Sequence, residues 1–259
     1  MLKRLERGWR ILATGLCFTC FGLGSVMLGA VVFPLLRLLL RDRVCVERTA
    51  RALIRLTFRA FVHLMQSARV LTVEVQGLEL LNGGGRLILA NHPTLIDVVL
   101  LMALVESGDC VIKGALGRNP VTRGTVRAAG FVFNDDGGEE LVEDCVRSVR
   151  TGNNLIIFPE GTRTPRGEPM RLQRGAARVA VHGAVDITPV RIRCTPATLA
   201  KGEKWYQVPA RRPHFCIEVA ATIPVAPFID AASSHALAAR HLNRHLTDYF
   251  SKEHELASA

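Results

Sequence analysis

The first seventy residues carry two long hydrophobic patterns of different kinds. Residues 11–36 contain no charged side chain, and as a helix at about 1.5 Å per residue they would reach roughly 39 Å, beyond the ~30 Å hydrocarbon core of a bilayer. Residues 46–70 place apolar side chains at helical spacing. Four arginines follow one side of this second segment: Arg48, Arg51, Arg55 and Arg59. We therefore predict a membrane helix and a basic amphipathic helix, forming a hairpin that anchors the protein against one leaflet.

Other interpretations of this region stay open from the sequence. A true span across the bilayer is compatible with the length of the uncharged run. A cleaved signal peptide is less so, because its apolar core usually spans about 7–15 residues. The arginine stripe would suit a solvated core helix, but directly after a membrane segment we favour an interfacial helix. Each arginine near an anionic leaflet would then add about 1 kcal/mol of attraction.

After residue 70 short apolar runs alternate with helical segments. We expect strands at residues 70–75, 86–90, 109–113, 131–133, 154–158, 187–193 and 215–221. We expect helices at residues 94–105, 119–129, 138–150, 171–182 and 234–250. This alternation is typical of an α/β fold with a mostly parallel central sheet covered by helices. The chain is thus predicted to contain the anchoring helices in residues 1–69 and an α/β domain in residues 70–259.

Composition and charge favour a membrane partner over nucleic acid. The 259 residues are 49% hydrophobic with a formal net charge of +10, and residues 1–69 hold twelve basic against three acidic side chains. Basic chains bind nucleic acid or anionic membranes. Here the basic residues flank apolar sequence and no nucleic-acid motif follows, so we expect no nucleic-acid partner. The seven scattered cysteines suggest no disulfide framework, which fits a reducing, cytosol-facing location.

Candidate chemistry begins where the strand at residues 86–90 meets the next helix. The sequence there is Asn91-His92-Pro93-Thr94-Leu95-Ile96-Asp97. Pro93 suits the first position of a helix, which would leave His92 at the cap and Asp97 in the second turn. A carboxylate on one imidazole nitrogen fixes the tautomer, and the other nitrogen can accept a proton. A capping histidine with an acid favoured by the helix dipole would give the same spacing.

A second polar cluster follows the strand at residues 154–158. It reads Phe158-Pro159-Glu160-Gly161-Thr162-Arg163-Thr164. Arginine can hold a phosphate bidentately, threonine can donate to it, and glycine lets backbone approach it. Taken alone, this cluster would also suit a polar turn between a strand and a helix.

Together, NHPTLID and FPEGTRT, about sixty-five residues apart, resemble blocks of the glycerolipid acyltransferase family. Its best-known members are the 1-acylglycerol-3-phosphate acyltransferases. Further segments resemble the family's middle, basic and last blocks: Lys113, Pro120 and residues 130–133; Arg174-Gly175-Ala176; and Thr188-Pro189-Val190. The resemblance covers roughly residues 70–225 and implies the glycerolipid acyltransferase fold in a membrane-associated O-acyltransferase of phospholipid synthesis.

The resemblance also implies roles for the catalytic pair. His92 would be the general base that deprotonates an acceptor hydroxyl, and Asp97 would orient it. The hydroxyl would attack the thioester of acyl-CoA or of an acyl-carrier protein, which is a co-substrate. No metal, cofactor or covalent acyl-enzyme is implied. The expected location is the cytoplasmic face of a membrane, with a bacterial inner membrane favoured.

Six further residues are expected at the substrate. Arg163 and Thr162 would position the acceptor's phosphate, Gly161 would let backbone approach, and Glu160 would orient Arg163 or brace the loop. Two more basic residues belong to the predicted substrate site: Lys113 and Arg174.

One position departs from the family pattern and leaves the acceptor open. The middle block commonly ends in an arginine that helps hold phosphate, and the aligned residue here is Asp136, which would repel it. The acceptor is then either 1-acyl-sn-glycerol-3-phosphate, giving phosphatidic acid, with Arg174 or Lys113 compensating, or a specialised acceptor or acyl chain from a dedicated carrier-protein pathway. A noncatalytic lipid-binding membrane protein is the alternative of another class, and intact His92, Asp97 and Arg163 argue against it.

Two weaker candidates lie near the carboxyl terminus. His241 and His245 are four residues apart and could bind a metal, although a solvated helix surface is favoured. A basic and aromatic segment precedes them: Lys201, Lys204, Trp205, Tyr206, Arg211 and Arg212. It would contact lipid headgroups or the acidic helix of a carrier protein, or form an ordinary exposed loop.

Overall fold

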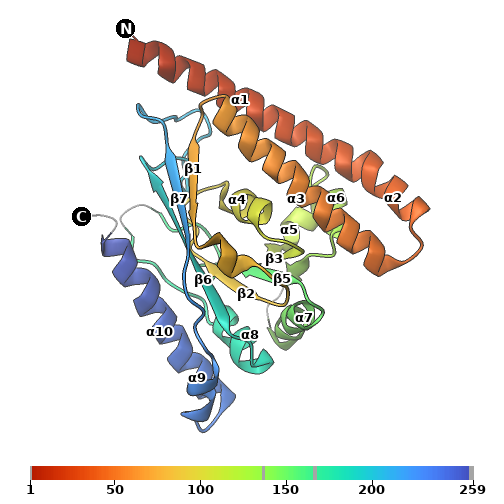
Figure 1. The fold of residues 1–259 in the computed structure, drawn as a ribbon, viewed down its shortest axis with the longest axis vertical. Helices are drawn as coiled ribbons and strands as arrows, with labels where there is room; N and C mark the ends of the chain where they lie inside the picture. The colour runs from red at the N-terminus through yellow and green to blue at the C-terminus, as the bar shows by residue number, and fades with distance from the viewer. Residues whose placement is uncertain (1, 136–137, 166–167, 257–259) are drawn as a thin grey trace.

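A seven-stranded sheet forms the centre of the computed structural model, which describes residues 2–135, 138–165 and 168–256 (Figure 1). The strands lie in the order β1-β7-β6-β2-β5-β3-β4. Their bounds are β1 Thr72–Gln76, β2 Leu87–Ala90, β3 Gly108–Lys113, β4 Val132–Asn134, β5 Asn154–Ile157, β6 Ile187–Thr195 and β7 His214–Val219. Neighbouring strands are parallel except β6 and β7, which are antiparallel. The predicted mostly parallel α/β sheet is confirmed.

Helices cover both faces of this sheet. Ile88 and Ala90 of β2 join a core with α1 (Leu2–Met27), α3 (Arg43–Ser67), α4 (Asp97–Leu104) and α6 (Arg123–Ala128). Leu87 and Leu89 of the same strand join a second core with α7 (Gly138–Arg150), α8 (Gly175–Gly183) and α10 (His235–Leu256). Because successive side chains of a strand point to opposite faces, a strand buried on both sides reads as a continuous apolar run. The remaining helical elements are η1 Leu28–Val32, α2 Phe33–Leu39, η2 Leu78–Leu81, α5 Gly114–Arg118 and α9 Ala226–Asp230.

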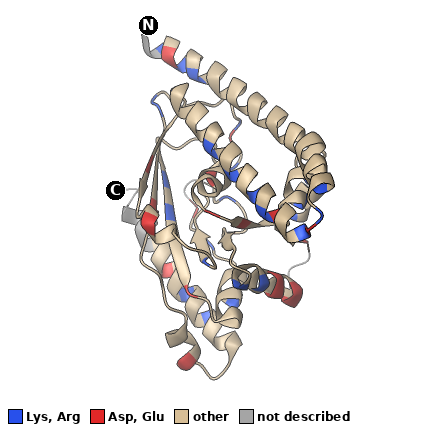
Figure 2. Ribbon diagram, turned by 45° about the vertical axis from the view of Figure 1, so that its right-hand side comes forward, with Lys and Arg blue, Asp and Glu red and all other residues tan. Residues whose placement is uncertain are grey.

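The uncharged amino-terminal run forms one long helical rod. Helix α1 continues through the π-helical turn η1 into α2, and α3 returns along it (Figure 1). The segment Arg4–Leu39 is long and apolar enough to cross a membrane by length and composition. Figure 2 shows few charged positions along the rod beyond its first turns. Gly29 and Gly124 bring the rod against α6, since a Cβ on Gly124 would lie 2.5 Å from the Cα of Gly29.

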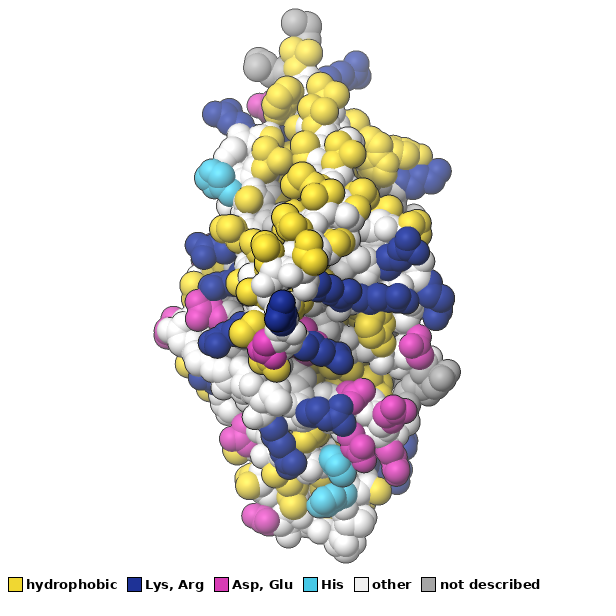
Figure 3. Space-filling model, turned by 90° about the vertical axis from the view of Figure 1, so that its right-hand side faces the viewer, with side chains coloured by type: hydrophobic (Ala, Val, Ile, Leu, Met, Phe, Trp, Pro, Cys, Tyr) yellow, Lys and Arg dark blue, Asp and Glu magenta, His cyan; other side chains and the backbone are white. Residues whose placement is uncertain are grey.

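The rod leaves a wide apolar surface exposed. Large hydrophobic side chains cover the outward side of α1, η1 and α2 in Figure 3, and basic side chains lie beside them. The exposed hydrophobic residues there are Leu5, Trp9, Leu12, Leu16, Leu23, Val26, Met27, Val31, Leu35, Leu38 and Leu39. The opposite side of α1 is buried in the same core as α3 and the sheet. The division between residues 69 and 70 therefore stays a prediction, because one core joins the two parts.

Two of the four arginines in the predicted stripe of α3 turn toward the domain instead of outward. The Arg51 side chain is 7% exposed, and its Nη2 lies 3.4 Å from Asp109 Oδ2. Arg55 Nη1 lies 2.7 Å from Glu106 Oε1. The prediction of a leaflet-facing stripe is wrong for these two residues, whereas Arg48 and Arg59 are exposed. The physical reason is that α3 covers the sheet, so this side of the helix meets carboxylates at the ends of α4 and β3.

Candidate active site

The loop between β2 and α4 carries the predicted catalytic pair. Helix α4 begins at Asp97, so the predictions that Pro93 opens the helix and that Asp97 lies in its second turn are wrong. The Asp97 carboxylate accepts hydrogen bonds from the Thr94 N–H at 2.6 Å and the Thr94 hydroxyl at 2.5 Å. These bonds close residues 94–97 as a turn before the helix. The turn brings the Asp97 carboxylate back toward His92.

The structure brings His92 and Asp97 into direct contact. Nδ1 of His92 lies 2.9 Å from Oδ2 of Asp97, with side-chain exposures of 17% and 0%. Burial raises the pKa of Asp97, and the hydrogen bonds from His92 and Thr94 oppose that rise. With Nδ1–H donated to the carboxylate, Nε2 is the nitrogen that can accept a proton. The geometry suits a general base, and the catalytic role itself stays a prediction.

Two residues of the loop after β5 hold His92 from the other side. Oε1 of Glu160, which is 6% exposed, accepts a hydrogen bond from the His92 backbone N–H at 2.7 Å. Its Oε2 accepts from the Thr164 hydroxyl. The Phe158 ring lies against the imidazole with centroids 4.4 Å apart. Of the two roles expected for Glu160, these contacts are those of a brace between the two loops.

Asn91 fixes the start of the catalytic loop on strand β6. Its side-chain oxygen accepts from the Ile192 N–H at 2.7 Å, and its amide donates to the Ile192 carbonyl at 2.9 Å. The backbone register of β2 and β6 ends at Ala90 and Val190. The asparagine side chain therefore continues the pairing for one more step and places His92 at the carboxyl edge of the sheet, where ligand sites of α/β folds open.

The expected phosphate-binding residues are arranged around the same edge. Gly161 has φ of 69°, a conformation that favours glycine, and Thr162 is exposed. Arg163 is half-buried, and its Nη1 donates to the carbonyls of Leu199 and Ala200 at 3.0 and 3.1 Å. One nitrogen of the Arg163 guanidinium thus donates its hydrogen bonds to backbone carbonyls of the protein.

The other basic candidates come from neighbouring elements. Lys113 ends β3 and is exposed. Arg174 is the N-cap of α8 and is exposed.

Asp136 lies outside the described residues. On the terminal helix, His245 packs against the Phe228 ring with centroids 5.3 Å apart.

Sequence reasoning missed the turn around Leu199. Its carbonyl accepts from the Leu95 N–H at 3.0 Å and from Arg163. It therefore touches the loop between β2 and α4 and the loop after β5, which we call the two signature loops. Leu199 has φ of 55°, which is uncommon for a residue with a Cβ. The leucine itself carried no signal, because the left-handed conformation usually selects glycine or asparagine.

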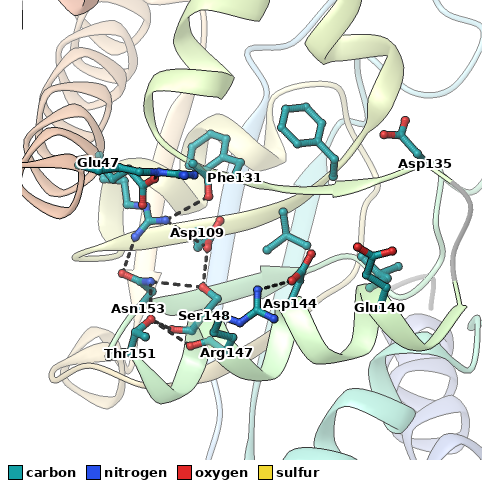
Figure 4. Close-up of a pocket in the computed structure, with 16 residues that line it drawn as sticks. Glu47, Asp109, Phe131, Asp135, Glu140, Asp144, Arg147, Ser148, Thr151 and Asn153 are labelled. Atoms are coloured by element: carbon teal, nitrogen blue, oxygen red, sulfur yellow. Dashed lines mark hydrogen bonds and ion pairs between the residues drawn. The ribbon is translucent and has the colours of Figure 1, made fainter. Parts of the chain in front are cut away.

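A polar groove of about 640 Å³ lies beside β4 and α7, and neither His92 nor Asp97 lines it (Figure 4). Arg51 enters it from α3 and binds Asn153 Oδ1 at 2.5 Å, the Gly130 carbonyl at 3.2 Å and Asp109. Ser148 donates to Asp109 at 2.5 Å. This network ties α3 to the sheet and to α7.

Known proteins with similar sequences are acyltransferases. The Acyltransferase family model matches residues 72–193. A 1-acyl-sn-glycerol-3-phosphate acyltransferase of Helicobacter pylori is 31% identical over 113 residues, 41% of this chain and 48% of that protein. The corresponding protein of Saccharomyces cerevisiae is 28% identical over 148 residues, 54% of this chain and 49% of the yeast protein. The matched stretches span about half the length of these curated relatives.

A solved structure shares the fold over the whole chain. The crystal structure of the 1-acyl-sn-glycerophosphate (LPA) acyltransferase PlsC from Thermotoga maritima has a TM-score of 0.71 at 20% identity, covering 99% of this chain and 98% of that one. The sheet with its histidine–aspartate pair and the matched region define a domain of the acyltransferase class. Residues 72–193 thus match the Acyltransferase family, and the relatives that resemble this chain are named 1-acyl-sn-glycerol-3-phosphate acyltransferases.

Proposed function

We propose that the protein is a membrane-associated O-acyltransferase. It transfers a fatty acyl group from acyl-CoA or an acyl-carrier protein to the hydroxyl of a lysophospholipid, with 1-acyl-sn-glycerol-3-phosphate as acceptor and phosphatidic acid as product. The observation that carries the proposal is the 2.9 Å contact between His92 Nδ1 and the buried Asp97 carboxylate at the carboxyl edge of the sheet. The named activity of the curated relatives supports it.

The proposed reaction follows from the tautomer that Asp97 imposes. His92 Nε2 removes the proton of the acceptor hydroxyl as its oxygen attacks the thioester carbonyl. The tetrahedral intermediate expels the thiolate, and the imidazolium then gives its proton to this leaving group. Asp97 stays ionised and stabilises the imidazolium between the two steps. General-base assistance of this kind contributes about 10²–10⁴-fold to the rate.

The acceptor's anionic headgroup would lie against the loop after β5. Arg163, Thr162 and the backbone at Gly161 offer donors there, with Lys113 and Arg174 at the same edge of the sheet. Arg163 is the strongest of these candidates, because two carbonyls fix one of its nitrogens and so orient its planar guanidinium. Binding of the headgroup at this loop would bring the acceptor hydroxyl toward His92.

The exposed side of α1 and α2 supports contact with a membrane. Contiguous apolar surface of this extent is rare on soluble monomers, and neighbouring arginines would favour an anionic leaflet. We place the helical rod in the plane of one leaflet, with the cytoplasmic face of a bacterial inner membrane as the proposed location. Lysophospholipid would then reach the site from the bilayer.

The test is acyl transfer by the full-length protein in detergent micelles. We expect labelled acyl-CoA or acyl-carrier protein plus 1-acyl-sn-glycerol-3-phosphate to give labelled phosphatidic acid. His92→Ala should lower the rate by at least about 10²-fold. The matched control is His63→Ala, which removes an exposed histidine of α3 and should leave the rate unchanged. Transfer by His92→Ala at the wild-type rate would reject the mechanism.

A panel of acceptors tests the substrate. Asp136 would repel a phosphate, so a less anionic lysolipid or a specialised alcohol is the second candidate. Preference for such an acceptor over 1-acyl-sn-glycerol-3-phosphate would assign the protein to a dedicated pathway. Absence of acyl transfer to every acceptor, with lipid binding retained, would instead identify a noncatalytic lipid-binding protein.

A further inference from the structure

The segment between β6 and β7, residues 196–213, touches both signature loops at its start. We call this segment the strap. The Leu199 carbonyl accepts from the Leu95 N–H and from Arg163, and the Ala200 carbonyl accepts from Arg163 as well. The strap therefore holds the residue proposed to bind the acceptor's anionic group.

The middle of the strap rests on helix α1. The Trp205 ring approaches Gly15 so closely that a Cβ there would lie 3.1 Å from the indole. Leu199 and Ile96 line a small apolar pocket together with Trp205 and Thr14 of α1. Residues of the catalytic loop, the strap and the amino-terminal helix thus face the same small pocket.

The far end of the strap is tied to α1 by two arginines. Nη2 of Arg10 donates to the Ala210 carbonyl at 2.7 Å and to the Pro209 carbonyl at 3.2 Å. Nε of Arg7 donates to the Val208 carbonyl at 3.0 Å. Arg10 is only 5% exposed, so α1 uses a buried cation to hold backbone carbonyls of the strap.

The strap is braced internally between these ends. The Glu203 N–H donates to the Ala200 carbonyl at 3.1 Å, and the Gln207 N–H donates to the Lys204 carbonyl at 2.9 Å. Side chains close the same turns, because Glu203 accepts from the Ala200 N–H and Gln207 accepts from the Lys204 N–H. Two consecutive closed turns transmit the position of one end to the other better than an open loop.

Leu199 shows that the arrangement is imposed on the backbone. A leucine with φ of 55° lies in a sparsely populated region, and such a conformation persists only where surrounding contacts determine it. Leu199 is buried, lines the small apolar pocket, and has two donors on its carbonyl. Loss of the α1 contacts would remove part of that constraint.

We propose that Arg10 and Trp205 are positioning residues that act through the strap on Arg163, so that docking of helix α1 on the domain sets the affinity for the acceptor's anionic group. This inference rests on the proposed acyltransferase function. Helix α1 would thus serve the active site as well as the membrane. A guanidinium that is already fixed in its binding orientation loses less conformational entropy when it binds an anion than a mobile guanidinium does.

The experiment separates positioning from anchoring by using a short-chain, water-soluble acceptor with the full-length protein in detergent micelles. Arg10→Gln should raise KM for the acceptor roughly tenfold, the size expected from partial loss of a charge-assisted hydrogen bond, with kcat changed by less than about twofold. Arg10→Lys should recover part of this. Arg4→Gln removes the same charge from an exposed position of the same helix and should leave KM unchanged.

A double-mutant cycle identifies the route. If Arg10 acts through Arg163, Arg10→Gln should have no further effect on KM in an Arg163→Ala background. Full additivity of the two substitutions, or equal KM values for Arg10→Gln and Arg4→Gln, would overturn the inference. The loss of rate in His92→Ala, measured in the same assay, reports on the acyltransferase function independently.

A second pair of variants decides the question if Arg10→Gln does not fold. The Trp205 ring packs on Gly15 of α1. Trp205→Ala should raise KM for the acceptor, and Trp205→Phe, which keeps an aromatic ring at this position, should raise it less. Equal KM values for Trp205→Ala and the wild type would contradict the proposed route through α1.

Discussion

Replacing Arg51 by methionine tests whether α3 is held on the domain by a buried ion pair. Arg51 and Asp109 have side-chain exposures of 7% and 1%. Methionine keeps much of the volume but leaves the Asp109 carboxylate with only neutral donors, the Ser148 hydroxyl and the backbone N–H groups of Cys110 and Val132. Removing one partner of a buried pair costs about 3–5 kcal/mol. For a chain of this size we expect Tm to fall by roughly 10 °C.

The pH dependence of this loss distinguishes a stranded charge from lost packing. Burial raises the pKa of Asp109 and Arg51 opposes that rise, so Arg51→Met should raise the pKa further above its unfolded value. The folded state then binds the proton more tightly than the unfolded state. The stability deficit should therefore be largest at pH 8 and shrink as the pH falls through the raised pKa, where the carboxylate of the variant takes up its proton.

Thermal unfolding at pH 5, 6.5 and 8 measures both effects. Arg48→Met is the matched control, because Arg48 is exposed on the same helix, and its free energy of unfolding should change by less than about 0.5 kcal/mol. Adding Asp109→Asn to Arg51→Met should restore part of the loss by removing the buried charge. If Arg51→Met and Arg48→Met unfold at the same temperature, Arg51 faces outward and the reasoning is wrong.

Two further predictions concern the catalytic loop and need only steady-state kinetics. Glu160→Ala leaves the His92 N–H without its acceptor, and losing a hydrogen bond to a charged group costs about 1.5–3 kcal/mol. We therefore expect kcat to fall roughly 10- to 150-fold. Glu160→Gln keeps an oxygen acceptor and should recover most of the rate, so equal rates for the two variants would contradict the role of Glu160 as a brace. Asp97→Asn should lower kcat by up to about 10⁴-fold, with KM little changed, because the amide favours the wrong imidazole tautomer. A wild-type rate for this variant would show that the carboxylate is not needed.

The sequence allowed the sheet to be predicted because its strands are simple. Each strand of the centre is buried on both faces, as Leu87 and Ile88 of β2 are, so apolar runs separated by helical patterns suffice to identify them. The sequence placed His92 before the helix that carries Asp97, where its imidazole can reach the carboxylate, and the two side chains do meet. The start of α4 was placed wrongly because Thr94 and Asp97 form a turn whose hydrogen bonds compete with the helix.

Other features could not be predicted because periodicity identifies a stripe on a helix without identifying what it faces. The spacing of Arg51 and Arg55 is the same whether the arginines meet lipid phosphates or carboxylates of the same domain. The partners, Asp109 and Glu106, lie more than fifty residues away and belong to unremarkable segments. Likewise, the attachment of the strap depends on backbone carbonyls, which every residue has, so no side-chain pattern marks it.

The same limit applies to the uncharged run, whose length alone suggests a span across the bilayer. In the folded chain α1 has two distinct sides: Arg10, Ala13, Thr14 and Cys17 are buried against the domain, and Leu5, Trp9, Leu12 and Leu16 are exposed. A helix that crossed a membrane away from the domain would expose its whole circumference to lipid, including the guanidinium of Arg10 and the hydroxyl of Thr14. It would also lose the strap contacts that reach Arg163. Contact with one leaflet through the exposed side keeps both sets of interactions, and for this reason we favour the in-plane arrangement.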